Sequence, residues 1–444
     1  MRYGKILLTA MALFLSLCLS GCLTLSVDEM YTLPRQSDEY NELQSAINET
    51  LKEGLQYASP VSGANQQPIQ LADLTGDGLD EAIVFTKADG VKPLRAQIFA
   101  REGEGYTGLC SIDGDGSAFD RVEYVQLDGE PGLEIVLGRR IGNQVLQSVG
   151  AYALLDGQLT ELMSANYTEF RITDLDGDDA RDLFLIRFDA ENTTAVAEVY
   201  RFFNGAMERS TEVPLSADAS ALRHITTGNL QEGRRAVFVA STSAEELVVT
   251  DVFTLDDGKL NVRRSDLDYG LFNCPVRGYS VYANDLDGDG LLELPNVVLL
   301  NPYSEEAADD KFYAIEWHSV AGGSPKYKLT TYHNHSSGWY LTMPKKLGSR
   351  FIVRRGDTVA GARGLEFYTD RAGRPGESVF TLYAFSGDNR GTLATQDGRF
   401  VLGAKNEVTY CAMLGDAAER LGVTQEELST MFRFIRVNWD PGET

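Results

Sequence analysis

The sequence contains few cysteines and histidines. Of its 444 residues, five are cysteine and four are histidine. Only Cys110, Cys274 and Cys411 lie beyond the first 22 residues, and an odd number at such wide spacing indicates neither a disulfide framework nor a zinc site. We expect these three to be buried small apolar side chains. The chain also lacks a nucleophile motif, a Gly-rich phosphate loop and an HExxH zinc motif, so the sequence predicts no catalytic site and no enzyme.

Positive charge is also scarce. The chain has 40 Lys and Arg against 65 Asp and Glu, a net charge of -25. Such a surface repels nucleic acid and anionic lipid headgroups, so neither is expected as a direct partner, whereas cations are. Apolar residues make up 43% of the chain, which is enough to bury at least one large core.

The chain has no apolar run long enough for a comfortable membrane span. The longest candidate, residues 6–19, follows the basic residues Arg2 and Lys5 and indicates an export signal. The run ends in Leu-Ser-Gly-Cys at 19–22, which resembles the lipobox of bacterial lipoproteins, whose cysteine receives lipid and becomes the first mature residue. The alternative is an ordinary secretory signal that happens to contain a cysteine. We therefore expect a signal peptide at 1–21, lipid on Cys22, a tether at 22–35 and an extracytoplasmic location on the bacterial cell membrane.

Residues 36–60 are predicted to form an N-terminal helix. Ser37 offers an N-cap, and an apolar stripe follows at helical spacing, formed by Tyr40, Leu43, Ile47, Leu51 and Leu55. The polar face is acidic, which disfavours a helix lying on a membrane. We expect this helix to pack on the next domain.

An acidic, glycine-rich motif of nine residues occurs three times, each time just before a short apolar run. The copies are Asp73–Glu81, Asp174–Asp182 and Asp285–Glu293. Two weaker copies lie at Gln126–Glu134 and around Asn229–Arg235. The five repeats therefore begin near residues 73, 126, 174, 227 and 285, a period of roughly 50 residues.

Between these motifs the sequence alternates short β-rich segments with turns. Asn204-Gly205 and Asp257-Gly258 are dipeptides that a tight hairpin favours, because its central residues need positive φ. Each repeat thus reads as an acidic loop, a buried strand and a hairpin, which is the size of one four-stranded propeller blade. The predicted fold class is mainly β, with a β-propeller at 61–325.

After residue 326 the repeat is no longer visible, and 326–444 is predicted to be a small α+β domain. Six further β-rich segments lie between 338 and 413. A short helix is expected at 416–421. Thr424 and Glu427 form a capping box for a last helix, with an apolar stripe of Leu428, Met431, Phe432 and Ile435.

The spacing of oxygen side chains in the nine-residue motif suits a hard cation. Positions one, three and five offer side-chain oxygens, position seven its carbonyl and position nine a carboxylate, and the glycines let the loop close. Calcium fits better than magnesium, because six or seven ligands from a flexible loop suit the larger ion. An EF-hand is excluded, since the twelfth positions are Val84, Leu185 and Asn296 instead of glutamate. The predicted ligands are Asp73, Thr75, Asp77, Leu79 and Glu81; Asp174, Asp176, Asp178, Ala180 and Asp182; and Asp285, Asp287, Asp289, Leu291 and Glu293.

These loops resemble the FG-GAP or VCBS repeat of integrin α-chain propellers and of many bacterial surface proteins. The resemblance covers about residues 65–300, strongly at three repeats and weakly at two. It implies a propeller with about three structural calcium sites, the one at 73 being weaker because Thr75 replaces an acid. Gln126 in the first position implies that the second repeat holds no ion. The whole chain resembles uncharacterised gut-bacterial VCBS-repeat lipoproteins, which implies no activity.

Three functions remain open from the sequence. The first is a calcium-stabilised, lipid-anchored protein that binds a protein or glycan ligand by adhesion or recognition. The second is a polysaccharide-active, lyase-like enzyme on a propeller scaffold, although only His333 and His335 suggest a further metal site. The third is a scaffold for a complex near the membrane, in which Trp317, Trp339 and Trp439 of the last third could anchor a partner.

Overall fold

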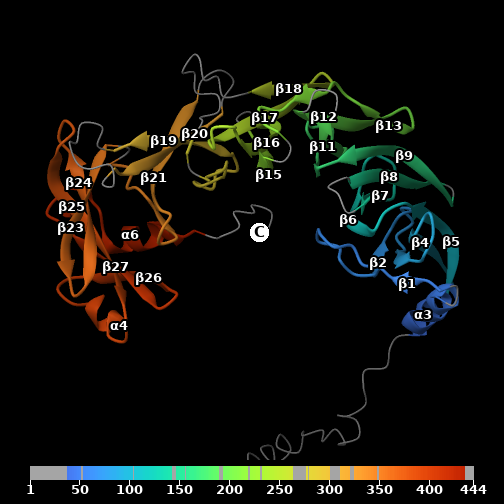
Figure 1. Cartoon of the computed structure of the whole chain (residues 1–444), viewed down its shortest axis with the longest axis horizontal. Coiled ribbons are helices and arrows are strands. Elements are labelled where there is room, and N and C mark those ends of the chain that lie inside the picture. Colours follow the sequence, from blue (N-terminus) through green and yellow to red (C-terminus); the bar gives the residue numbers. More distant parts are fainter. Residues whose placement is uncertain are drawn as a thin grey trace, which may run out of the picture. The chain divides into compact units, whose positions relative to one another are not determined.

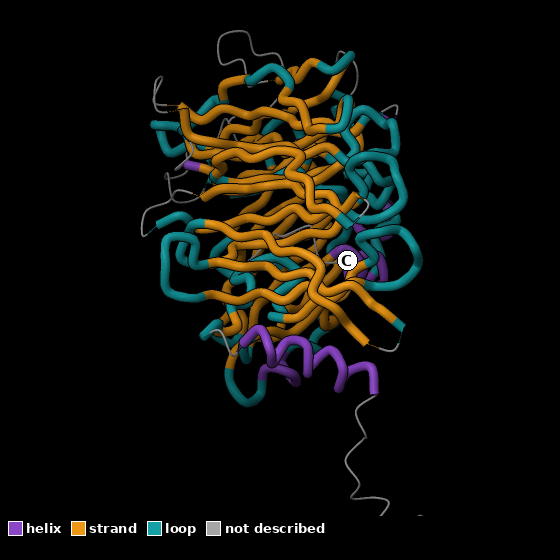
Figure 2. The backbone as a smooth tube through the Cα atoms, turned by 90° about the vertical axis from the view of Figure 1, so that its right-hand side faces the viewer, coloured by secondary structure: helices purple, strands orange, loops and turns teal. Residues whose placement is uncertain are grey.

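The computed structural model describes residues 38–435, apart from 52–53, 104, 143–146, 156, 190–193, 219–220, 231–232, 264–276, 279, 301–310, 321–324 and 348–349. Strands dominate these residues (Figure 2). The chain divides into two compact units, the first formed by Met1–Ser59, Gln67–Ala72 and Leu79–Gly114 and the second by Pro60–Gln66, Asp73–Gly78 and Asp115–Thr444. The predicted signal peptide, Cys22 and the tether lie outside the described residues. Within the described part, no helix is both long and apolar enough to cross a membrane.

The first unit consists of one helix and one antiparallel sheet. The helix α3 (Asp38–Leu51) follows the predicted apolar stripe, and its Leu43 and Ile47 are buried against Ala82, Val84 and Phe99. It therefore packs on the sheet that follows it in the chain, as the acidic polar face led us to expect. The sheet contains β1 (Gln56–Tyr57), β2 (Ile69–Ala72), β3 (Glu81–Lys87), β4 (Leu94–Glu102) and β5 (Gly105–Gly114).

The second unit contains five antiparallel sheets, each built mainly from consecutive strands (Figure 1). Counting the sheet of the first unit as sheet 1, we number them in chain order. Sheet 2 is β6 (Ala118–Val125), β7 (Glu134–Arg140), β8 (Gln147–Leu155) and β9 (Gln158–Tyr167); sheet 3 is β10 (Glu169–Thr173), β11 (Asp182–Asp189), β12 (Thr194–Phe203), β13 (Ala206–Arg209) and β14 (Val213–Pro214); sheet 4 is β15 (Leu222–Asn229), β16 (Arg235–Thr242), β17 (Val248–Asp256) and β18 (Lys259–Arg263).

The last two sheets carry the C-terminal part of the chain. Sheet 5 is β19 (Glu293–Leu299), β20 (Tyr313–Ser319), β21 (Lys326–Asn334), β22 (Trp339–Thr342) and β28 (Phe432–Phe434); sheet 6 is β23 (Phe351–Val359), β24 (Ala362–Asp370), β25 (Pro375–Ser386), β26 (Phe400–Lys405) and β27 (Val408–Leu414). Three short helices accompany them, namely α4 (Arg390–Leu393), α5 (Ala418–Leu421) and α6 (Gln425–Met431).

Consecutive sheets of the second unit pack face to face, which explains why their central strands read as continuous apolar runs. In β11, Leu183 and Leu185 pack toward sheet 2, whereas Phe184 and Ile186 pack toward sheet 4. Side chains alternate between the two faces of a strand, so a strand between two sheets must be apolar at every position. The strand β16 repeats this arrangement with sheets 3 and 5.

The predicted hairpins are confirmed by their backbone conformation. Asn204 and Gly205 have φ of 51° and 87° between β12 and β13, and Asp257 and Gly258 have φ of 50° and 73° between β17 and β18. Positive φ at both central residues gives the turn a twist that matches the strands on either side. The Asn-Gly and Asp-Gly dipeptides therefore locate the hairpins correctly.

The boundary predicted at 325/326 lies between two strands of one sheet. The strand β20 pairs with β21, for example Glu316 with Thr330, so sheet 5 continues beyond the predicted end of the repeats. This continuity is not visible in the sequence, because β21 and β22 follow no acidic loop of their own. Sheet 6 and the short helices α5 and α6 share one hydrophobic core with sheet 5.

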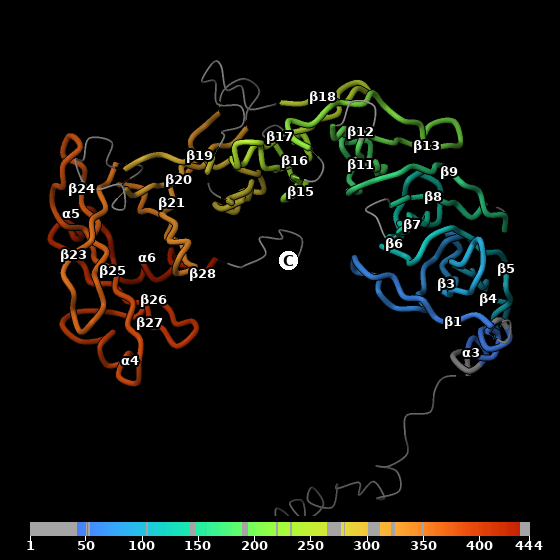
Figure 3. Tube along the Cα trace, in the orientation of Figure 1, coloured from blue at the N-terminus to red at the C-terminus, as the bar shows by residue number. Residues whose placement is uncertain are grey.

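The chain ends differently from the prediction. The helix α6 begins with Thr424, whose side chain accepts from the backbone N–H of Glu427 at 3.1 Å, so the predicted cap is confirmed. The helix stops at Met431, however, and Phe432–Phe434 pairs with β22 of sheet 5 as the strand β28. Figure 3 shows β28 directly after α6. Phe432 is buried among the aromatic residues Trp339 and Tyr410, and this contact favours an extended strand over another helical turn.

A ring at the contact between sheets 3 and 4 tests how much this packing contributes to stability. Phe253 is fully buried, with its ring centroid 5.2 Å from that of Phe184. We expect Phe253→Ala to lower the free energy of unfolding by about 3–5 kcal/mol, because it leaves a cavity between two sheets. Phe203→Ala is the control, since Phe203 is 58% exposed, and should cost less than ~0.5 kcal/mol. Urea unfolding followed by fluorescence measures both, and equal losses would contradict the packing described here.

Candidate metal centre

The first aspartate of each strong acidic motif organises its loop. Asp285 accepts from the backbone N–H groups of Gly288 at 2.8 Å, Asp289 at 3.2 Å and Gly290 at 2.9 Å. Asp174 accepts in the same way from Gly177, at 2.7 Å, and from Asp179. Asp73 does so from Gly76 and Gly78. One carboxylate thus folds the loop back on itself.

The sixth position of the loops needs a left-handed backbone. Gly78 and Gly290 have φ of 84° and 83° there, which glycine adopts without steric cost. In the loop at 174 the same position is Asp179, with φ of 72°. A non-glycine residue in this region is strained, so this loop is held in shape by its surroundings more than the other two.

The carboxylate at position nine is buried at the start of the following strand. Glu293 is 0% and Asp182 is 3% exposed. Each accepts a backbone N–H from the second residue of its loop, Leu286 at 3.1 Å and Leu175 at 2.9 Å. Burial raises the pKa of both carboxyls to about 7. The other oxygen of Glu293, Oε1, is buried without a hydrogen-bond partner.

The predicted ligands converge in two of the three loops. Carboxylate oxygens of Asp285, Asp287, Asp289 and Glu293 lie within 4.8 Å of one another. In the loop at 174, Asp174, Asp176 and Asp182 meet in the same way, whereas Asp178 is outside the group. These two loops are therefore acidic clusters able to hold a metal ion. At 73, the predicted ligands Asp73, Thr75 and Asp77 belong to the second compact unit, and Leu79 and Glu81 to the first.

The ligands predicted to act through a carbonyl are less defined. The N–H groups of Ala180 and Leu291 donate to the side chains of Asp178 and Asp289, both at 3.0 Å. These bonds fix the fifth side chain and the seventh residue together. The carbonyl role of Leu79, Ala180 and Leu291 stays a prediction.

Two basic side chains contact the acidic clusters, and neither contact was predicted from the sequence. Arg201 of β12 pairs with Asp176, with Asp178 at 3.5 Å and with Asp182 at 3.4 Å. Lys328 of β21 pairs with Asp289 and with Asp287 at 3.3 Å, and this contact raises the pKa of Lys328 and lowers that of Asp289. Both lie on later strands, 25 and 39 residues along the chain from their partners, so no local spacing marks them.

The repeat at 126 shows how a loop closes without an acid in the first position. The Gln126 carbonyl oxygen accepts from the N–H groups of Asp128 at 3.0 Å and Gly129 at 2.7 Å, as the aspartates do elsewhere. Its amide nitrogen donates to the carbonyls of Glu130 and, at 3.0 Å, Gly132. Glu134 is buried and accepts from the N–H of Leu127 at 2.5 Å. The Gln126 amide thus closes this loop through both of its polar atoms, and the absence of an ion from this repeat stays a prediction.

The other residues singled out in the sequence lie in the core or lie outside the described residues. Trp317 is fully buried and donates from its indole to Thr331 at 2.8 Å, and Trp339 is 3% exposed, so neither is a surface anchor for a partner. His333 stacks on Tyr340, and its ring centroid lies 5.4 Å from that of His335. Cys411 is buried and Cys110 half-buried. Cys274 and Trp439 fall outside the described part of the chain.

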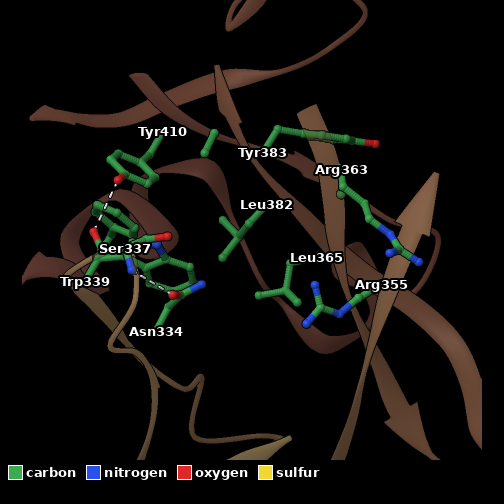
Figure 4. A pocket seen from close by; sticks show the side chains of 12 residues that line it. Asn334, Ser337, Trp339, Arg355, Arg363, Leu365, Leu382, Tyr383 and Tyr410 are labelled. Atoms are coloured by element: carbon green, nitrogen blue, oxygen red, sulfur yellow. Dashed lines mark hydrogen bonds between the residues drawn. The ribbon is translucent and has the colours of Figure 1, made fainter. Parts of the chain in front are cut away.

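A cavity of about 170 Å³ lies between sheets 5 and 6 (Figure 4). Arg355 and Arg363 line one side of it and Trp339 and Tyr410 the other. This site could not be predicted from the sequence, because its residues come from seven strands of two sheets.

No family model matches the chain, and no curated protein does. Among solved structures, the chain is similar to the exotype rhamnogalacturonan lyase YesX, with 12% identity, a TM-score of 0.29 and coverage of 84% of this chain and 79% of that one. A rhamnogalacturonan lyase of Bacillus licheniformis is 11% identical, with a TM-score of 0.29 and coverage of 84% of this chain and 77% of that one. An exo-β-1,3-galactanase of Phanerochaete chrysosporium is 10% identical, with a TM-score of 0.28 and coverage of 78% of this chain and 82% of that one. TM-scores this low carry no argument about substrate or residues.

The neighbours nevertheless bear on one expectation. All three are enzymes, so the prediction that this chain is not an enzyme is contradicted and is not retained. The prediction rested on missing nucleophile, phosphate-loop and zinc motifs. That reasoning does not cover chemistry carried by carboxylates alone, because a reactive pair cannot be picked out of 65 acids by spacing.

Arg201 tests whether the cluster at 174 needs a positive charge. In the presence of a chelator we expect Arg201→Met to destabilise the fold by roughly 1–3 kcal/mol, because Asp176 and Asp182 then repel each other without a partner. Thermal melting measures the loss. Arg223→Met is the control, since Arg223 is exposed on β15 and donates to the carbonyl of its neighbour Leu222. Equal effects of the two substitutions would show that the cluster does not depend on Arg201.

Proposed function

We propose that this chain is a calcium-stabilised, FG-GAP/VCBS-type repeat protein that takes a polysaccharide as its ligand or substrate. The observation that carries the calcium part is the loop at 285. Four carboxylates meet there, and Glu293 Oε1 is buried without a hydrogen-bond partner. A bare oxygen among converging carboxylates is costly unless a cation completes the site.

The donor set fits calcium. Asp285, Asp287, Asp289 and Glu293 would hold the ion at one loop and Asp174, Asp176 and Asp182 at the other. Oxygen donors alone, in a flexible loop, suit a hard cation that accepts six to eight ligands. A bound ion would supply positive charge where Lys328 and Arg201 supply it in this structure. The role is structural, because each cluster ties a loop to the first residue of a buried strand.

The repeat arrangement supports the propeller type and its cellular location as parts of this proposal. The motifs at 126, 174 and 229 join the first and second strands of their sheets, the motif at 73 joins β2 and β3, and the motif at 285 leads directly into β19. Each sheet has four or five antiparallel strands, close to the four strands of a propeller blade. The lipobox resemblance at Cys22 supports lipid anchoring to the bacterial membrane outside the cytoplasm. A partner protein remains the alternative to a glycan, and nucleic acid is disfavoured by the net charge of -25.

Melting the protein with calcium and with a chelator tests the structural role of the ion. Free calcium at about 100 times the dissociation constant adds ~2.7 kcal/mol per site, so we expect Tm to rise by about 5 °C or more. The double variant Asp176→Ala, Asp287→Ala should lose most of this rise. Asp128→Ala is the matched control, because Asp128 holds the same loop position in the repeat at 126. A calcium effect of the same size in all three proteins would refute the assignment of the two loops.

A polysaccharide ligand is supported by the cavity between sheets 5 and 6. It combines aromatic and aliphatic walls with guanidinium and amide groups, the mixture that orients a polar ring against an apolar surface. The three neighbours described above are named for such polymers, and those polymers are therefore included among the compounds tested below.

A panel of neutral and acidic plant and bacterial polysaccharides tests this second part. We expect at least one of them to retard the calcium-loaded protein in affinity gels, which shows binding. The release of reducing or unsaturated ends from the same polysaccharide would show that it is also a substrate. Binding should weaken when Leu365, a half-buried residue of the cavity wall, is replaced by serine in a variant that keeps its melting temperature in calcium. If no polysaccharide of the panel retards the protein or is cleaved by it, the polysaccharide proposal is refuted, whereas the calcium proposal is unaffected.

A further inference from the structure

The cavity between sheets 5 and 6 differs in charge from the rest of the molecule. Two arginines line it, and none of the described residues that line it is acidic. In a chain with 65 acidic residues and a net charge of -25, the two arginines concentrate positive charge at this cavity, with the Glu366 and Asp357 carboxylates near enough to act on Tyr383. A cationic cavity inside an acidic protein attracts anions selectively, because the surrounding surface repels them elsewhere.

The two arginines are brought to the same side of the cavity by an irregularity in the hairpin β23–β24. Arg355 pairs with Leu365, and after a shift in register Thr358 pairs with Arg363. A bulge of this kind re-aims side chains that a regular strand would send elsewhere. Figure 4 shows both guanidiniums on one side, across Leu365 and Leu382 from Trp339. Each guanidinium can bind a carboxylate through two parallel N–H···O bonds.

The opposite side offers aromatic contacts with hydrogen-bonding groups beside them. The ring of Tyr410 is fixed by its hydroxyl, which donates to the Ser337 carbonyl at 3.2 Å, and it lies edge-on to Trp339 with 6.4 Å between centroids. The Asn334 oxygen accepts from the Ser336 hydroxyl and the Ser337 N–H. The bonds orient this amide, whose nitrogen can donate to a hydroxyl. Such a wall suits the C–H face of a sugar ring.

Size then limits the ligand to one ring. The cavity measures about 170 Å³, below the ~300–1,000 Å³ typical of sites for drug-sized molecules. A chain of sugars does not fit, but the terminal unit of one does.

We infer that this cavity binds a uronic acid, the carboxylate-bearing sugar unit at the end of an acidic polysaccharide. Arg355 and Arg363 bind the carboxylate, Leu365, Leu382 and the aromatic wall contact the ring, and Asn334 donates to a hydroxyl. The inference rests on the proposed polysaccharide ligand and names its class. A bare anion lacks the ring that the apolar wall contacts, and a neutral sugar lacks the charge that the arginines require.

Paired sugars that differ only in the carboxylate test this inference. Calcium-loaded protein is titrated with galacturonic acid and galactose, and with glucuronic acid and glucose, and binding is followed by ligand-observed saturation-transfer NMR. We expect each acid to bind at least about tenfold more tightly than its neutral partner, since charged hydrogen bonds contribute most of the difference. Arg363→Gln should reduce that preference to about twofold or less.

The control is Arg374→Gln, because Arg374 is exposed in the turn between β24 and β25, on the same sheet but outside the cavity. This variant should bind like the native protein, which separates the cavity from general charge attraction. Arg363 is exposed, so its replacement leaves the core intact, and an unchanged melting temperature verifies this.

Three results would overturn the inference. One is equal binding of acidic and neutral sugars, which leaves the polysaccharide proposal standing. Another is competition by inorganic phosphate or sulfate as strong as that by the uronic acids, which would indicate a simple anion site. The third is an equal loss for Arg363→Gln and Arg374→Gln. Failure of every sugar and every polysaccharide would instead refute the proposed function on which the inference rests.

Discussion

The structure depends on one buried carboxylate in each of four repeats, at the first residue of the strand that follows the loop. Glu81, Glu134, Asp182 and Glu293 each stand at the first residue of a strand and are at most 4% exposed. At three of these positions the carboxylate accepts a backbone N–H from the second residue of the preceding loop. The bond joins the turn to the strand and places an ionisable group where water does not reach it. Negative charge there must be balanced.

The repeats balance that charge in different ways. At 174 and 285, further aspartates gather around the buried group and attract a cation, whether a metal ion or the side chain of Arg201 or Lys328. At 126, the N–H of Leu127 donates to Glu134, and burial raises the pKa of that carboxyl to about 7, which favours its neutral form. The N–H of the fourth loop residue donates to the first side chain in every loop, whether that side chain is Asp or Gln. The sixth residue donates only in the three Asp loops, because Pro131 occupies that position at 126. The loops therefore share their first turn and differ in the part that follows it.

The sequence predicts well what depends on neighbouring residues. The apolar runs, the Asn-Gly and Asp-Gly hairpins, the helix stripe of Leu43 and Ile47 and the Thr424 cap all express local preferences, and the structure has them where the patterns indicate. Contacts between distant segments leave no such trace. Lys328 reaches an acidic loop on an earlier strand, and β28 returns to β22 across about 90 residues of chain. The arginine cavity is assembled from both of the last sheets, so only coordinates bring its residues together.

The Gln126 amide also bears on how the second unit depends on the ions around it. The loop at 126 carries its own donor, so its closure needs no ion. Leu127 of that loop is fully buried and packs with Phe170 and Leu183 of the next sheet, whose own loop holds three converging carboxylates. Sheet 2 therefore presents to sheet 3 an apolar contact that does not depend on the ionic composition of the solution.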